Sequence, residues 1–292
     1  KNNYWKNIPL ENESMLHTPI FAEKLKNYFD KIVFQIPDSI NLEIAKIYSR
    51  IYSAKNSYMW SMSWLTQFYE KKGQQYMGFE SVFVAIVDSF YETGKVDFYN
   101  AKQLEKIITR KNVLKPLLIG KTVPDLFTVD TNGMKVCLRL KMDTCRTSGC
   151  LTKIYETNRI ELSRQLISIK DVKAEYTVLV FWDIDCGHCK KDIPVLFEKF
   201  KELREKDSID VKVAAVYDQS DFVKWPKTIK EMQLLDPNWT NLADGVHLQN
   251  FKDKFDVYSN PVIYILDKNK VIRYKRIGAE QVGDAIRNMA RG

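Results

Sequence analysis

The chain has 292 residues, 45% of them hydrophobic and 28% charged, and it carries a formal net charge of +8. This length and apolar content are typical of an ordinary globular protein with about two domains, each able to bury a core. No run of about 18 apolar residues is present, which excludes a membrane-spanning helix, and the Lys and Arg residues are dispersed, which favours a solvated basic surface over a nucleic-acid site.

Residues 18–114 carry apolar positions spaced by three and four, a pattern typical of amphipathic helices. The repeat comprises Phe21, Leu25, Tyr28, Phe29, Ile32, Ile44, Ile47 and Ile51. We predict that residues 1–117 form an all-α helical bundle. Ser39 is the predicted N-cap of one helix, Gly73 and Gly94 are predicted helix ends, and Asn100 is predicted to open a last helix over residues 101–111.

Within this half, Trp60, Trp64 and Phe68 recur at intervals of four residues, so they share one face of a helix. Such a stripe fits two structures, a groove for a peptide and an ordinary packed core. We favour the core, because buried aromatic stripes of this kind are common.

After Gly120 the pattern changes to that of an α/β domain, which we place at residues 118–292. Residues 127–129, the turn sequence from Asp130 to Gly133 and residues 134–140 predict a β-hairpin, because Asn-Gly supplies the positive φ of a tight turn. The polar stretch at about residues 141–170 is treated as an insertion with one short helix near residues 160–166.

Three short apolar runs follow, at residues 177–182, 211–217 and 262–266, with helical patterns between the first two and before the third. Runs that are apolar on both faces are typical of central strands covered by helices, so this alternation predicts a βαβ unit. Residues 271–277 alternate with charged residues and predict an antiparallel edge strand. Residues 280–289 predict a terminal amphipathic helix.

The most informative motif is Cys186-Gly187-His188-Cys189, which lies between a predicted strand and a predicted helix. A helix N-terminus has unsatisfied N–H groups and roughly half a positive charge, which favours a thiolate at the first cysteine. The two-residue spacing lets the second sulfur reach the first, so Cys189 can resolve a mixed disulfide formed on Cys186. We therefore predict dithiol redox chemistry.

The other cysteines leave alternatives open. Cys145 and Cys150 fit a local structural disulfide, an electron relay to Cys186 or two unrelated thiols, and the disulfide is favoured because it would stabilise a loop without a core. A zinc site would need this pair as additional ligands, and its spacing and the small number of His residues argue against that. Cys137 is predicted to be a small buried hydrophobic residue.

The second half resembles the TlpA and ResA branch of exported thiol-disulfide oxidoreductases, from about Gly120 to Gly292. The resemblance rests on residues 178–182, which end in Trp182, on the motif from Cys186 to Cys189 and on residues 190–194. It implies a thioredoxin-like α/β domain with a mixed central sheet flanked by helices, and hence an α+β two-domain chain. The helical half is similar to a domain of unknown function that precedes such modules in Bacteroidetes proteins.

The resemblance also implies roles for single residues. Cys186 matches the nucleophile, Cys189 the resolving cysteine and Pro261 a cis proline that offers backbone to a bound peptide in a strand-like pose. Asn260 stands where relatives often carry Thr or Val, and Gly187 belongs to the motif backbone that positions substrate.

Two further side chains have alternative interpretations. Asp192 matches an acidic residue near the active site of ResA-like proteins, which would take the proton of the resolving cysteine, and it also fits an ordinary solvent-facing Asp. His188 would stabilise the Cys186 thiolate or simply face solvent, while Asp183 and Asp185 would oppose that stabilisation. Val180 stands where thioredoxin itself has a buried Asp, which favours the TlpA branch.

The resulting hypothesis is a thiol-disulfide oxidoreductase that acts on protein thiols or disulfides and is reset by an upstream thiol reductant or oxidant, with no metal, no bound cofactor and no nucleic acid. A thioredoxin-like binding module, whose helical half recruits a partner, is the competing hypothesis. A peroxidase of related fold would need a supporting Thr and Arg that the residues around Cys186 do not supply. The expected location is the periplasmic face, with membrane association only through a lipid anchor outside this chain. The absence of a leader before Tyr4 also fits a cytosolic protein.

Overall fold

The computed structural model describes residues 4–6, 8–244 and 249–292. The chain divides into two compact units, Lys1–Leu118 and Ile119–Gly292. Each unit has its own hydrophobic core.

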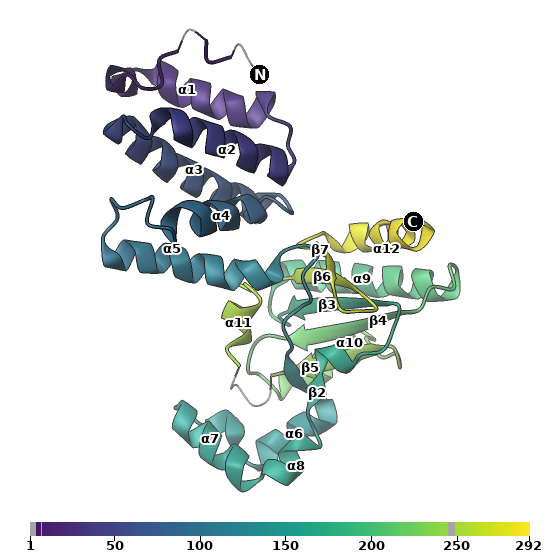
Figure 1. Cartoon of the computed structure of the whole chain (residues 1–292). Coiled ribbons are helices and arrows are strands. Elements are labelled where there is room, and N and C mark those ends of the chain that lie inside the picture. Colours follow the sequence, from purple (N-terminus) through teal and green to yellow (C-terminus); the bar gives the residue numbers. More distant parts are fainter. Residues whose placement is uncertain (1–3, 7, 245–248) are drawn as a thin grey trace. The chain divides into compact units, whose positions relative to one another are not determined.

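The first unit is helical, and its α-helices lie beside one another in chain order (Figure 1). Its elements are η1 (Glu13–His17), α1 (Pro19–Asn27), η2 (Tyr28–Ile32), α2 (Pro37–Ile51), α3 (Lys55–Gln75), α4 (Glu80–Ile86), η3 (Val87–Tyr91), α5 (Ala101–Leu114) and η4 (Lys115–Leu117). The predicted apolar repeat forms the core of this unit with the exception of Ile32, which is exposed.

The helix ends of this unit agree with the sequence only in part. Asn100 opens α5 with a capping box to Gln103, as expected. Ser39 is not an N-cap, because α2 already begins at Pro37, whose missing N–H costs nothing in the first turn. Gly73 does not end α3 but lies in its last turn, where it permits close approach of the Glu80 backbone.

The aromatic stripe of α3 is packed and half-buried. The rings of Trp60 and Trp64 are stacked with centroids 6.3 Å apart, and those of Trp64 and Phe68 are stacked at 4.6 Å. All three side chains pack against the core of the first unit. The stripe therefore contributes to packing, as the sequence favoured, while part of each ring stays accessible.

The second unit is built on a mixed sheet with the strand order β2-β1-β5-β4-β3-β6-β7 (Figure 1). The strands are β1 (Phe127–Asp130), β2 (Ile167–Ser168), β3 (Tyr176–Trp182), β4 (Val211–Tyr217), β5 (Trp239–Ala243), β6 (Val262–Asp267) and β7 (Ile272–Lys275). Strands β3, β4 and β5 are parallel, whereas β6 is antiparallel to β3 and β7 is antiparallel to β6. The predicted βαβ unit and edge strand are confirmed, and β5 is a strand that the sequence analysis missed.

Helices cover both faces of this sheet. The helices of the unit are α6 (Thr131–Arg139), α7 (Ser148–Thr157), α8 (Arg159–Ser163), α9 (Gly187–Glu205), α10 (Lys224–Glu231), α11 (Phe251–Lys254) and α12 (Val282–Arg291), with short turns η5 (Met142–Thr144), η6 (Ile169–Asp171) and η7 (Ala279–Gln281). Alternate residues of β3, such as Val178 and Val180, join the core formed with α9 and α12. Phe181 faces the opposite way and contacts Phe251 and Phe255 of the α11 segment.

The predicted hairpin at residues 127–140 is wrong, because β1 is followed directly by α6. The Asp130 side chain accepts hydrogen bonds from the N–H groups of Asn132 and Gly133 at 2.9 and 2.8 Å, and so caps the helix. Gly133 is needed for close packing on Val129 rather than for a turn. Cys137 is buried as expected, but on a helix instead of a strand.

The predicted insertion at residues 141–170 contains more structure than one helix. It holds η5, α7, α8 and β2, and α8 overlaps only the first part of the expected helix at residues 160–166. Strand β2 pairs with β1, so this segment ends as part of the sheet. Each of these elements is short and largely exposed, so the sequence carries no regular apolar repeat that would predict them.

Candidate active site

The Cys186–Cys189 motif lies where β3 passes into α9. Cys186 is the N-cap of α9, and its sulfur accepts a hydrogen bond of 3.4 Å from the Cys189 N–H. The chain turns tightly here because the Cys186 N–H is bonded to the Asp183 carbonyl at 3.3 Å. The first sulfur therefore lies at the positive end of a 19-residue helix.

The two thiols of the motif differ in environment. Cys186 is half-exposed, whereas Cys189 is fully buried. Burial raises the pKa of the Cys189 thiol well above its ordinary value of 9.0, and the nearby Cys186 and Asp183 add to this effect against the opposing backbone N–H of Asp183. Cys186 is thus the accessible sulfur, and Cys189 is a protected thiol behind it.

The loop that contains Asn260 and Pro261, the cis-proline loop, leads into β6 and borders the Cys186–Cys189 motif. The peptide bond between Asn260 and Pro261 is cis. The Cys186 thiol donates to the Asn260 carbonyl over a sulfur–oxygen distance of 3.5 Å. The structure therefore brings together Cys186, Cys189, Asn260 and Pro261, four of the site residues that the sequence predicts.

The other predicted site residues surround this centre less closely. Trp182 is only 1% exposed and packs edge-on against Tyr217, so it supports the motif from within the core and does not face solvent. Gly187 and His188 are exposed in the first turn of α9. Asp192 is half-buried one turn beyond Cys189, and the described hydrogen bonds and ion pairs include none between Asp192 and either cysteine.

The acidic residues ahead of the motif are not equivalent. Asp185 is exposed and forms an ion pair with Lys224, which lowers the pKa of the Asp185 carboxyl. The charge that would oppose a thiolate on Cys186 is therefore partly balanced at this position. Asp183 is half-buried, and its side chain accepts a hydrogen bond of 3.0 Å from the Asp185 N–H.

A buried carboxylate that sequence reasoning missed lies behind the cis-proline loop. Asp218 follows β4 directly, is 6% exposed and accepts a hydrogen bond of 2.9 Å from the Asn260 side chain. The Lys252 ammonium lies 3.7 Å from the same carboxylate oxygen. A polar residue immediately after a central strand was the available signal, since the ends of such strands commonly carry functional groups.

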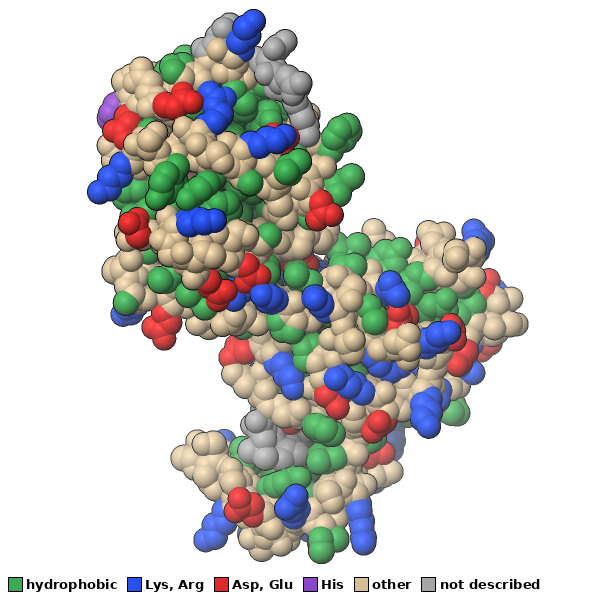
Figure 2. All heavy atoms as spheres, viewed as in Figure 1, with side chains coloured by type: hydrophobic (Ala, Val, Ile, Leu, Met, Phe, Trp, Pro, Cys, Tyr) green, Lys and Arg blue, Asp and Glu red, His purple; other side chains and the backbone are tan. Residues whose placement is uncertain are grey.

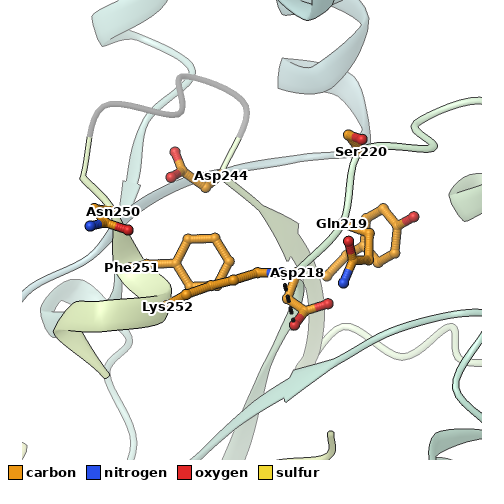
Figure 3. A pocket seen from close by; sticks show the side chains of 8 residues that line it. Asp218, Gln219, Ser220, Asp244, Asn250, Phe251 and Lys252 are labelled. Carbon is orange, nitrogen blue, oxygen red and sulfur yellow. Dashed lines mark ion pairs between the residues drawn. The ribbon is translucent and has the colours of Figure 1, made fainter. Parts of the chain in front are cut away.

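Asp218 and Lys252 belong to the lining of a pocket of about 290 Å³ (Figure 3). Its further lining residues include Gln219, Ser220, Asn250 and Phe251. In Figure 3 the Lys252 side chain runs beside the Phe251 ring toward Asp218. The Asp218–Lys252 pair therefore shares this pocket with polar and aromatic side chains.

The cysteines outside the motif have separate roles. Cys145 and Cys150 form a disulfide, with Cα atoms 5.6 Å apart, which excludes this pair as zinc ligands in the structure. Cys137 is a buried free thiol, and burial raises its pKa to about 11. Across the described ranges 4–6, 8–244 and 249–292, no three His, Cys, Asp or Glu residues gather as a metal site.

The surface carries charged side chains of both signs (Figure 2). On the face drawn in Figure 2, Lys and Arg side chains are interspersed with Asp and Glu side chains. No helix within the described part of the chain has the length and apolar character needed to span a membrane.

Two comparisons relate the chain to known proteins. Residues 154–275 match the model of the AhpC/TSA family. A domain of a possible thiol-disulfide isomerase from Cytophaga hutchinsonii is 32% identical, and the match covers 60% of this chain and 95% of that one, with a TM-score of 0.45. Among curated proteins, none matches the chain.

Two further solved structures have lower identity. A thioredoxin-like protein from Bacteroides caccae is 15% identical over 98% of this chain and 90% of that one, with a TM-score of 0.65. The thioredoxin domain of a thiol-disulfide oxidoreductase from Bacteroides vulgatus is 16% identical over 59% of this chain and 96% of that one, with a TM-score of 0.41. The Bacteroides caccae structure shows that the fold of nearly the whole chain, helical unit included, occurs in a thioredoxin-like protein.

Proposed function

We propose that Cys186 and Cys189 exchange electrons with disulfides or dithiols of other proteins. The chain belongs to the TlpA-like proteins of the thioredoxin superfamily. The observation that carries this proposal is the pairing of an accessible sulfur at a helix N-terminus with a buried thiol one turn behind it. An accessible, polarised sulfur suits attack, and a protected neighbour suits resolution.

In the reducing direction the steps balance as follows. The Cys186 thiolate attacks one sulfur of a substrate disulfide, so a mixed disulfide forms and one substrate thiolate leaves. Cys189 then loses its proton and attacks the Cys186 sulfur, which releases the second substrate thiolate and leaves a Cys186–Cys189 disulfide. A dithiol donor returns two electrons to this disulfide, and the oxidising direction is the reverse sequence.

The proton of Cys189 needs an acceptor, because burial holds this thiol in its protonated form. Asp192 is the acceptor that the family resemblance implies. Asp183 is a second candidate, since its charge acts on the pKa of Cys189. Either carboxylate would receive the proton as the resolving attack proceeds.

The substrate would lie against the cis-proline loop. The backbone of Asn260 and Pro261 borders Cys186, and an extended peptide can pair with such a segment as an added strand. Gly187 and His188 are exposed next to Cys186 and would contact the substrate on the side opposite the cis-proline loop.

The proposed location is an oxidising compartment such as the periplasm. A disulfide between Cys145 and Cys150 supports this, because disulfides persist in exported proteins and are rare in the reducing cytosol. Protein thiols and an upstream thiol donor or acceptor are the proposed partners.

Reduction of insulin disulfides with dithiothreitol as donor tests the proposal. We expect turnover by the wild-type chain, none by Cys186→Ser, and a trapped mixed disulfide with Cys189→Ser. Activity of the Cys186→Ser variant equal to that of the wild type would exclude this mechanism. If the wild type is inactive and Cys186 resists alkylation, the competing binding-module hypothesis gains support, and rapid turnover of hydrogen peroxide would instead favour a peroxidase.

A further inference from the structure

Asp218 is a buried acid to which the proposed exchange steps give no role. Its backbone N–H donates a hydrogen bond of 3.0 Å to the Trp182 carbonyl at the end of β3. Its carboxylate accepts from Asn260 Nδ2 at 2.9 Å. Asp218 therefore connects the strand that leads into the dithiol with the loop that faces it.

The contact with Asn260 has a defined polarity. A carboxylate is an acceptor only, so the amide nitrogen of Asn260 must face it. The amide oxygen, Asn260 Oδ1, is buried and makes no hydrogen bond within the described residues. Among the described residues, the bond to Asp218 is therefore the polar contact that orients the Asn260 side chain. The backbone carbonyl of Asn260 accepts a hydrogen bond from Cys186.

The surroundings of Asp218 make a negative charge at this position energetically costly. Burial is the largest influence and raises the pKa of Asp218, and the Asp183 charge acts in the same direction, whereas Asn260, Lys252 and Gln219 oppose it. A buried carboxylate is costly unless it is paired, and an apolar residue of similar size often serves stability better. Stability alone thus gives little reason for an acid here.

We propose that Asp218 is a positioning residue for disulfide exchange, because it holds Asn260 and thereby fixes the cis-proline loop against the Cys186 sulfur and the bound substrate. This inference rests on the proposed function and deepens it. Asp218 lies behind Asn260, so it acts through that residue and not on the reacting sulfur. Its loss should weaken substrate binding more than it slows the chemical step.

The test compares kcat and KM for insulin reduction in full-length variants. Asp218→Ala and Asn260→Ala should each raise KM about tenfold, which is the scale of a hydrogen bond to a charged group. The double variant should be no worse than the more affected single variant, because both changes break the same link. Asp218→Asn keeps an acceptor oxygen for Asn260 and should restore KM to near the wild-type value.

Asp221→Asn is the matched control. Asp221 lies three residues further along, is exposed and accepts a hydrogen bond from the Lys224 N–H. This substitution removes one negative charge from the same segment without touching Asn260, so KM should not change. Thermal unfolding of every variant separates misfolding from a change in binding.

Several results would overturn the inference. A folded Asp218→Ala variant with wild-type KM would do so, and so would single-variant effects that multiply in the double variant. If Asp218→Ala does not fold, the comparison of Asp218→Asn with Asn260→Ala decides, and equal KM values in these two would contradict the link. A wild type without insulin reductase activity would count against the proposed function instead.

Discussion

The side-chain amide of Asn260 donates a hydrogen bond of 2.9 Å to Asp218, a residue 42 positions earlier in the chain. The sheet explains the contact. Strand β4 runs parallel to β3 on one side, and β6 runs antiparallel to β3 on the other. The end of β4, which leads to Asp218, and the start of β6, which follows Asn260, therefore meet at the same edge of the sheet as the motif.

Alkylation should be selective for Cys186 in protein whose Cys186–Cys189 pair is reduced and whose Cys145–Cys150 disulfide is intact. At neutral pH we expect one iodoacetamide adduct on this half-exposed sulfur, because burial raises the pKa values of Cys189 and Cys137 and also shields them. Peptide mass spectrometry after brief labelling checks the site. Labelling of Cys189 at a rate equal to that of Cys186 would contradict the assigned roles, and unfolding in urea serves as the control that exposes all three thiols.

The two candidate proton acceptors can be separated by the rate of resolution. We expect Asp183→Asn to slow release of the thiol from a mixed disulfide by about 100-fold, the usual scale of a general base, and Asp192→Asn to slow it less. The measurement is stopped-flow release of the chromophoric thiol after reaction with a nitrobenzoate disulfide. A faster release in Asp183→Asn would show that this carboxylate only raises the pKa of Cys189 through its charge.

Asp218 should make the stability of the protein depend on pH in a definite direction. Its pKa in the folded state is raised above the ordinary value of 3.8, so its contribution to stability is fully present below that value and is lost as pH rises through the raised pKa. Asp218→Asn, neutral at every pH, should therefore unfold at a higher temperature than the wild type at pH 7. The two melting temperatures should converge below pH 3.8, and a constant difference across this range would contradict the assignment.

The Cys145–Cys150 disulfide should contribute to stability and not to turnover. Closing a loop with a sequence separation of 5 is worth about 2 kcal/mol through the entropy of the unfolded chain. Replacement of both cysteines by Ser should lower the free energy of unfolding by about this amount and leave insulin reduction unchanged. A loss of turnover in a folded double variant would instead favour an electron relay.

The sequence by itself determined the elements whose signals are local. Apolar runs on both faces identified β3, β4 and β6. The spacing of Cys186 and Cys189 at a strand-to-helix junction identified the motif for which we propose redox chemistry. The helical unit followed from its repeat, and Asn100 identified the start of α5. Each of these features depends on neighbours within a few residues, so the pattern of the chain was sufficient.

Only the tertiary structure decided the features that depend on distant partners. Residues 134–140 alternate like a strand, yet the capping side chain of Asp130 and packing on Val129 make them a helix. The hydrogen bond between Asp218 and Asn260 exists because the sheet brings the ends of two strands together. The identity of either residue does not predict its contact with the other. The different environments of Cys186 and Cys189 likewise arise from burial, a property that folding assigns and the spacing of two cysteines does not.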